Sequence, residues 1–181
     1  MKGYAATTVD DLCGKAGVSK GAFFHNFSSK EALAVAAADH WTTVTRDLFA
    51  EAAFHDLADP VDRVMGYVDF RCQLLEGPVE TFTCLAGTMV QETFRSSKAI
   101  REACEASILD HARTLEADIF DAIAASGVTG VTGVTARSLA LYTQTVLQGA
   151  FILSKATGGP DIARESVGHL KCYFELLFRP P

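Results

Sequence analysis

The sequence predicts an all-α fold in which a short helix-turn-helix head precedes a larger helical body. Three observations support this prediction. Apolar residues recur at the three- and four-residue spacing of helices, caps and glycine or proline breaks divide the chain, and no alternating strand pattern competes. Hydrophobic residues make up 49% of the chain, which is enough for a substantial core and leaves apolar surface for a dimer interface or an internal cavity.

The N-terminal residues predict two short helices joined by a tight turn. Thr8-x-x-Asp11 resembles a capping box, and it opens a helix over residues 9–16. Gly17 stands where a left-handed residue ends a helix, and a second short helix follows over residues 20–26. Two short helices around a glycine turn are the pattern of a helix-turn-helix, which holds its second helix at a fixed angle for the DNA major groove.

A long helix and five further helices are expected downstream. Ser28-x-x-Glu31 has the pattern of a full capping box and predicts a helix over roughly 29–53. The tandem triplets of residues 128–133 are β-branched and glycine-spaced, so we expect a loop there. Caps and breaks predict the other helices after Asp59-Pro60, around 80–95, from about 97 to 126, from 135 to about 157 and from 161 to 178.

Charge is spread unevenly along the chain. The net charge is −6, whereas residues 1–41 contain four lysines and four acidic residues, so the whole excess of acids lies downstream. A strongly basic nucleic-acid binder is therefore excluded. An electroneutral head remains compatible with DNA contact if its basic groups share one face.

The five cysteines lie far apart, with no C-x-x-C pair and no histidine at zinc-ligand spacing. We expect free thiols, no metal site and a reducing compartment. The sequence has no apolar stretch long enough to span a membrane and no signal pattern at its N-terminus. A cytoplasmic protein without a membrane partner is therefore expected.

The segment from Thr8 to Leu33, TVDDLCGKAGVSKGAFFHNFSSKEAL, resembles the DNA-binding region of TetR/AcrR-type regulators. The resemblance implies a helix-turn-helix DNA-binding domain over residues 1–41 and a ligand-binding and dimerisation domain over residues 42–181. The family has a full helix before the position of Gly3-Tyr4, where this sequence carries only two residues. Either residues upstream of Met1 are absent from this sequence, or the DNA-binding domain is N-terminally short and its first helix is missing.

The resemblance assigns eight residues to DNA contact. The second helix presents its first residues and outer face to the major groove, and helix N-termini hold phosphates. Phe24 stands where the family commonly has tyrosine, which removes one hydrogen bond to a phosphate. His25 and Asn26 also fit ordinary exposed positions, and Lys30 fits an ordinary first-turn residue. The eight residues are Thr8, Ser19, Lys20, Ala22, Phe24, His25, Asn26 and Lys30.

The family also holds an effector pocket in its helical body. Polar or aromatic residues within the apolar helices are the candidates here, and each of them also fits core or surface. Such a lining suits a small apolar or aromatic effector with a few hydrogen-bonding groups, and no cofactor is expected. The candidates are Tyr67, Phe70, Thr88, Met89, Glu92, His111, Tyr142, Gln144 and Gln148.

The last two helices of the family pair with those of a second subunit. Their apolar stripes suit either that homodimer interface or an ordinary core. The stripes consist of Ala136, Leu139, Ala140, Thr143, Leu147, Ala150 and Phe151 in one helix, and of Val167, Leu170, Phe174, Leu177 and Phe178 in the other.

The resemblance implies a ligand-responsive transcriptional regulator, with repression as the family's usual mode, that binds a pseudo-palindromic double-stranded DNA operator as a homodimer. One alternative is a ligand-binding helical dimer that has lost DNA binding. Another is an all-α enzyme, although the sequence contains no nucleophile elbow, metal-binding H-E-x-x-H, phosphate loop or dinucleotide fingerprint, and no catalytic residue is assigned. Detection of oxidants by Cys84 or Cys104 is a second sensing hypothesis.

Overall fold

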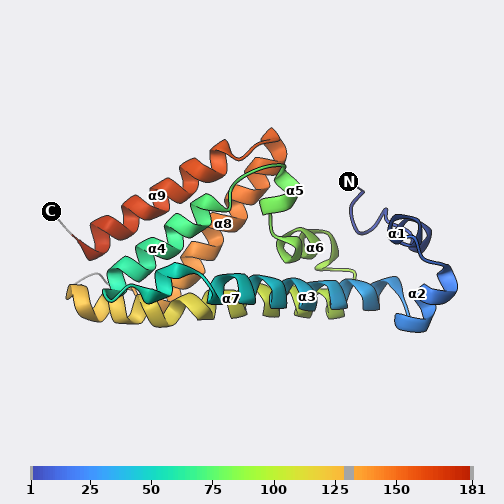
Figure 1. The fold of residues 1–181 in the computed structure, drawn as a ribbon, viewed down its shortest axis with the longest axis horizontal. Coiled ribbons are helices and arrows are strands. Elements are labelled where there is room, and N and C mark those ends of the chain that lie inside the picture. Colours follow the sequence, from blue (N-terminus) through green and yellow to red (C-terminus); the bar gives the residue numbers. More distant parts are fainter. Residues whose placement is uncertain (1, 129–132, 180–181) are drawn as a thin grey trace. The chain divides into compact units, whose positions relative to one another are not determined.

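The computed structural model describes residues 2–128 and 133–179, and all regular secondary structure in them is helical (Figure 1). The all-α prediction is confirmed. The expected loop over residues 128–133 falls mostly outside the described residues. In chain order the helices are α1 (Val9–Ala16), α2 (Lys20–Asn26), α3 (Lys30–Ala50), the 3-10 helix η1 (Ala53–Asp56), α4 (Pro60–Gln73), α5 (Val79–Phe82), α6 (Leu85–Thr93), α7 (Lys98–Ser126), α8 (Ala136–Thr157) and α9 (Asp161–Phe178).

The chain divides into two compact units, and each is discontinuous in sequence. The first comprises Met1–Thr45 and Leu85–Ile108, and the second comprises Arg46–Cys84 and Leu109–Pro181. The helix-turn-helix head therefore shares its unit with α6 and the first part of α7. Division of the chain by function into residues 1–41 and 42–181 stays a prediction.

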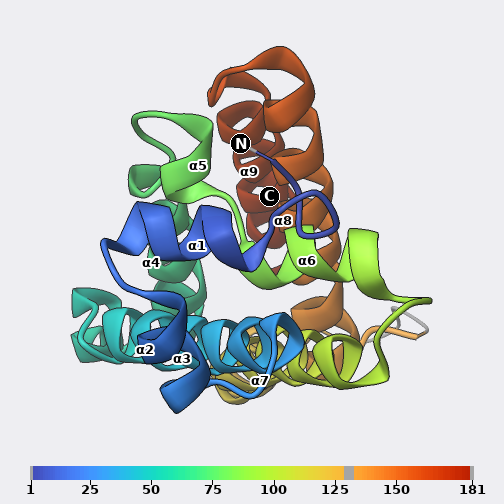
Figure 2. The ribbon, with the colours of Figure 1, turned by 90° about the vertical axis from the view of Figure 1, so that its right-hand side faces the viewer.

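The head helices begin and end at the predicted residues. The Thr8 hydroxyl accepts a hydrogen bond from the backbone N–H of Asp11, whose carboxylate accepts one from the backbone N–H of Thr8, so the capping box is complete. Gly17 ends α1 with φ 67°, a left-handed conformation that glycine adopts without steric cost. Cys13 of α1 and Phe23 of α2 are buried, and the two helices contact each other across this short turn (Figure 2).

The predicted capping box at Ser28 is wrong, because the neighbouring serine caps α3. The Ser29 hydroxyl accepts a hydrogen bond from the backbone N–H of Ala32 at 3.0 Å. The carboxylate of Glu31 accepts instead from the hydroxyl of Ser97, which itself caps α7 through the N–H of Ile100. The first helix of the body is also shorter than expected, since α3 ends at Ala50 and η1 follows.

The single helix expected around residues 80–95 is two helices. Thr83 adopts an extended conformation, with φ −87° and ψ 153°, and separates α5 from α6. The other predicted starts are correct. Asp59 caps α4 by accepting from the N–H of Val61, and Thr135 caps α8 in a box with Ser138.

The second unit is built on α4, α8 and α9, with α9 packed against both of the others (Figure 1). The apolar stripes predicted for α8 and α9 face this core. Every member is buried except Leu177, which is half-buried and packs against the core. Assigning the stripes to a dimer interface is therefore wrong, since burial within one subunit already removes them from water, at about 1.5–3 kcal/mol for each large side chain.

Candidate functional site

Helix α2 presents most of its side chains to solvent. Its N-cap is Ser19, whose hydroxyl accepts from the N–H of Ala22 at 3.1 Å. Phe23 is the buried residue that anchors the helix to the head, and Phe27 packs beside it with ring centroids 5.8 Å apart. All the α2 residues predicted to contact DNA are exposed, as Thr8 and Ser19 are, whereas Lys30 is half-buried.

Two of these polar side chains are engaged locally. The ammonium of Lys20 lies 2.8 Å from a carboxylate oxygen of Asp10, and this hydrogen bond raises the pKa of the lysine. The side-chain amide of Asn26 donates to the carbonyl of Ala22 at 2.9 Å. A DNA phosphate or base must therefore displace or share these contacts.

Lys30 is held against the turn that precedes α1. Its ammonium donates to the carbonyls of Tyr4 at 2.9 Å and Thr7 at 2.8 Å, and it lies 4.3 Å from the centroid of the Tyr4 ring. The charge thus sits beside the N-terminus of α1. The location agrees with a phosphate contact there, although two of its three N–H donors already serve the backbone.

Phe24 is 55% exposed, and its ring packs edge-on against Phe23 at a centroid separation of 5.1 Å. A large aromatic side chain at this exposure, on the outer face of a short helix, is available for contact with another molecule.

In the second unit, three predicted effector residues lie together. The hydroxyl of Tyr67 on α4 is 3.0 Å from Nε2 of His111 on α7, and both rings pack with Phe49. Phe70 joins them by an edge-on contact with Phe49, at a centroid separation of 5.1 Å. The result is an aromatic cluster with a polar centre.

Arg71 completes this cluster, although it is absent from the residues predicted from sequence. Its Nε donates to the Tyr67 hydroxyl at 3.0 Å, its Nη2 contacts Nε2 of His111, and its guanidinium lies 4.2 Å from the centroid of the Phe49 ring. The sequence feature that could have indicated Arg71 is its position one helical turn after Tyr67, which places it on the same face of α4. Burial, reinforced by the nearby Arg71 charge, lowers the pKa of His111 to about 3, so this imidazole is neutral near pH 7.

The remaining predicted residues lie elsewhere. On α8, Gln144 is buried and Gln148 half-buried, while Tyr142 is exposed and packs on Tyr173 of α9 at a centroid separation of 5.4 Å. On α6, in the first unit, Met89 is buried, Thr88 is half-buried and Glu92 is exposed. The Glu92 carboxylate accepts from the N–H of Ala5, which ties α6 to the head.

The two cysteines considered as sensors differ in access to solvent. Cys84 is half-buried and Cys104 is fully buried within α7. A fully buried thiol offers a reagent in solution no direct approach, which weakens the sensing hypothesis for Cys104. Within the described residues, no three histidine, cysteine or acidic side chains form a group able to hold a metal ion, and no helix is both long and apolar enough to cross a membrane.

Residues 1–37 match the family described as bacterial regulatory proteins of the tetR family. The head is also similar to YerO of Bacillus subtilis (strain 168), an uncharacterised HTH-type transcriptional regulator, with 48% identity over 40 residues, or 22% of this chain. The matched segment spans 14% of the length of that curated relative.

Two solved structures extend the likeness to nearly the whole chain. One is a TetR transcriptional regulator from Chloroflexus aurantiacus J-10-FL, with TM-score 0.78, 26% identity, and coverage of 94% of this chain and 84% of that one. The other is a cysteine mutant of the TetR family transcriptional regulator CifR, complexed with 26-bp double-strand operator DNA. It has TM-score 0.75, 18% identity, and coverage of 94% of this chain and 87% of that one. The head over residues 1–37 therefore matches the tetR family, and the all-α fold of nearly the whole chain is similar to the folds of solved TetR regulators.

Proposed function

We propose that this protein is a transcriptional regulator, acting as a repressor, that binds a double-stranded DNA operator and is released from it by a small-molecule effector. The observation that carries the proposal is the exposed face of α2 in a head that matches the tetR family. CifR, a structural neighbour, was solved on operator DNA, which supports the same use of this head. The fold and the likenesses favour a regulator over an enzyme.

The DNA contacts divide into two kinds. Lys20, at the first turn of α2, is suited to a phosphate because its charge is exposed at the end of a flexible side chain. His25 lies further along the helix, is exposed, and has a ring able to donate or accept on a base edge. Thr8 and Lys30 flank them at the N-termini of α1 and α3, where backbone N–H groups favour phosphate.

The operator is read by a homodimer formed through α8 and α9. The core stripes of these helices are already buried, so the partner must contact another face. Both helices carry exposed apolar residues, and the contact between Tyr142 and Tyr173 joins the two faces. A two-fold dimer would present two recognition helices roughly 34–36 Å apart, which matches a pseudo-palindromic operator. The proposed interface residues are Tyr142, Ile152, Leu153, Tyr173 and Leu176.

The effector site includes the aromatic cluster around Tyr67, Phe70 and His111. Ligand binding there favours a subunit arrangement in which the recognition helices no longer fit the groove. A coupling free energy of about 1–3 kcal/mol would lower operator affinity roughly 5- to 150-fold. Ligand release and the sign of regulation follow the family's usual mode.

The experiment is fluorescence anisotropy with a duplex from the region upstream of the protein's own gene and with a scrambled duplex, each at two salt concentrations. We expect tight binding to the first duplex only, weakening as salt rises. Lys20→Ala should weaken binding to all duplexes and make the slope of log affinity against log salt shallower by about two, one for the Lys20 of each subunit, whereas His25→Ala should reduce discrimination between duplexes.

Lys98→Ala is the matched control, because it removes an exposed lysine of α7 that is paired with a single glutamate, as Lys20 is paired with a single aspartate. It should leave affinity and discrimination unchanged. Equal, weak binding of the wild-type protein to both duplexes would instead favour a ligand-binding dimer without DNA recognition.

A further inference from the structure

Arg71 is the cation of the aromatic cluster, and it lacks a counter-ion within the described part of the chain. None of the ion pairs there involves it. Asp69, the acidic residue nearest to it in sequence, is bound by the ammonium of Lys171 at 2.6 and 2.9 Å. By contrast, Arg63, two turns earlier on α4, pairs with both Asp118 and Asp121.

The groups around this guanidinium are neutral. Aromatic rings lie close to it, with the Phe49 centroid at 4.2 Å and the Tyr67 centroid at 5.4 Å. Its hydrogen bonds go to a tyrosine hydroxyl and to the imidazole of His111, which is uncharged near pH 7. A half-buried charge among neutral groups is costly unless an anion completes the site.

The geometry leaves one edge of the guanidinium for that anion. Nε donates to the Tyr67 hydroxyl, and one N–H of Nη2 donates to Nε2 of His111. Among the described residues, none accepts a hydrogen bond from Nη1. The contacts hold the planar group in one orientation, so the remaining N–H groups form a preset fork. Such a fork matches the two oxygens of a carboxylate.

A second buried donor in the same compact unit is also unsatisfied. Nε2 of Gln144 on α8 is buried and has no hydrogen-bond partner among the described residues. A buried donor without an acceptor costs about 1–3 kcal/mol, but Gln144 lies on α8, outside the aromatic cluster, so it is not assigned to the proposed site.

We propose that the effector is a small carboxylate with an aromatic or other apolar body, and that Arg71 binds its carboxylate while Phe49 and Phe70 contact the body. This inference rests on the proposed function, because it specifies the ligand class of the proposed effector site. It changes the expectation from an apolar or aromatic molecule with a few hydrogen-bonding groups to one that carries a negative charge.

The test measures thermal unfolding of the full chain, without DNA, in the presence of matched pairs at constant ionic strength: benzoate and benzamide, phenylacetate and phenylacetamide, octanoate and octanamide. We expect at least one carboxylate to raise Tm in a saturable way while its amide does not. Arg71→Gln should weaken that apparent affinity by about tenfold or more, as expected for loss of a charge-assisted bond.

Arg46→Gln is the control, because it also replaces an arginine of the second unit by glutamine and removes the same single charge, but from an exposed position. It should leave the carboxylate response unchanged. If Arg71→Gln does not fold, Arg71→Lys keeps the charge without the fork and should give a weaker response than the wild type. Absence of stabilisation by every carboxylate, or equal stabilisation by carboxylates and amides, would overturn the proposal. The change in Tm is measured without DNA. A failure of the ligand proposal is therefore distinguishable from a failure of operator binding, which the anisotropy experiment measures.

Discussion

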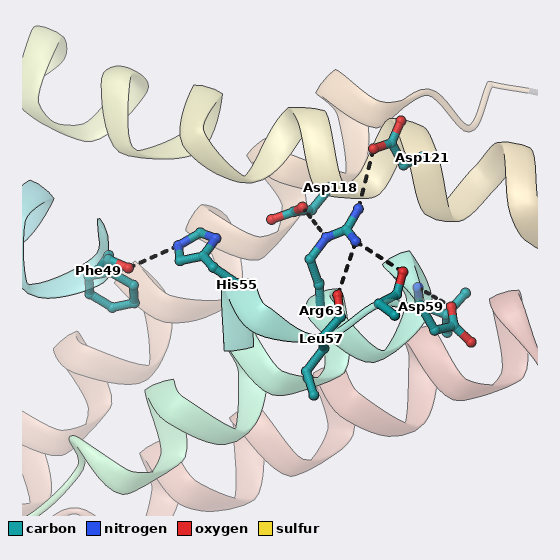
Figure 3. A network of polar contacts seen from close by, with 9 residues as sticks. Phe49, His55, Leu57, Asp59, Arg63, Asp118 and Asp121 are labelled. Carbon is teal, nitrogen blue, oxygen red and sulfur yellow. Dashed lines mark hydrogen bonds and ion pairs between the residues drawn. The ribbon is translucent and has the colours of Figure 1, made fainter. Parts of the chain in front are cut away.

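Nε of Arg63 on α4 donates to Oδ1 of Asp118 on α7 at 2.8 Å, and the two side chains are only 18% and 16% exposed (Figure 3). The same guanidinium donates to the carbonyls of Leu57 and Ala58 and to a carboxylate oxygen of Asp121 at 3.3 Å. One arginine therefore fixes the segment before α4 and the second half of α7 to α4, within the unit that contains the aromatic cluster.

Arg63→Gln should lower the free energy of unfolding by about 3–5 kcal/mol, because it leaves the carboxylate of Asp118 buried without its partner. Urea unfolding followed by circular dichroism measures the change. Arg46→Gln, which breaks an exposed pair with Asp47, should cost no more than about 1 kcal/mol. Similar small losses in both variants would show that the Arg63 network does not stabilise the fold.

Gly66→Ala should destabilise the second unit. A Cβ atom there would lie 2.6 Å from Cβ of Phe54 and 3.2 Å from Cδ1 of Leu57, so α4 and η1 would have to separate. We expect a loss of about 1–3 kcal/mol in urea unfolding, despite the better helix propensity of alanine. Gly168→Ala in α9 is the control, since its Cβ would meet no described atom within 4 Å. It should stabilise the protein by up to about 1 kcal/mol, and a gain in both variants would contradict the close contact.

Stability of the unliganded protein should fall as pH is lowered from about 6.5 to about 3. The ordinary pKa of a histidine side chain is 6.5, and the pKa of His111 is about 3 in the folded protein because of burial and the neighbouring Arg71. The unfolded state therefore binds more protons between about pH 3 and pH 6.5. The contribution of the neutral imidazole to the free energy of unfolding is fully present only above about pH 6.5 and is lost as the pH falls.

His111→Gln isolates that contribution, because glutamine keeps an acceptor for Arg71 and does not titrate. Between about pH 7 and pH 4 the wild type should lose about 3 kcal/mol more stability than the variant. Unfolding curves at several pH values measure the difference. Parallel pH profiles would show that His111 is not a buried neutral group.

Leu176→Glu should convert the proposed dimer to monomers. Leu176 is 67% exposed on the proposed α9 interface, and a carboxylate there would be buried without a partner in the dimer. Sedimentation velocity at micromolar concentration measures the change. Phe120→Glu is the control, since Phe120 is 65% exposed but lies on α7, outside the proposed interface. A dimer that persists in Leu176→Glu and dissociates in Phe120→Glu would assign the interface to α7 instead.

Helix boundaries could be predicted from sequence where a cap acts within four residues, as at Thr8, Asp59 and Thr135. The prediction was wrong at Ser28 because the adjacent Ser29 has the same chemistry and caps the helix, while Glu31 bonds to Ser97, distant in sequence, instead of closing a box with Ser28. Local patterns do not contain that contact.

Periodicity alone could not separate core from interface on α8 and α9. An apolar stripe shows that one face is buried, but it does not identify what covers the face, and here the packing of α9 against both α4 and α8 decides it. The candidate site was predicted in part: Tyr67, Phe70 and His111 lie together as aromatic and polar residues of apolar helices. Arg71 was missed because a helical arginine usually faces water, although its position one helical turn after Tyr67 places it on the same face of α4, where aromatic rings surround it.

The central claim, that α2 reads DNA sequence, is tested most directly by selecting bound duplexes from a random library with the wild-type protein and with His25→Ala. Because the library is random, the operator need not be identified before the selection. We predict enrichment of a two-fold symmetric sequence with half-sites about one helical turn apart, and loss of that consensus in the variant. Recovery of no consensus by the wild-type protein, or of the same consensus by both proteins, would contradict the claim.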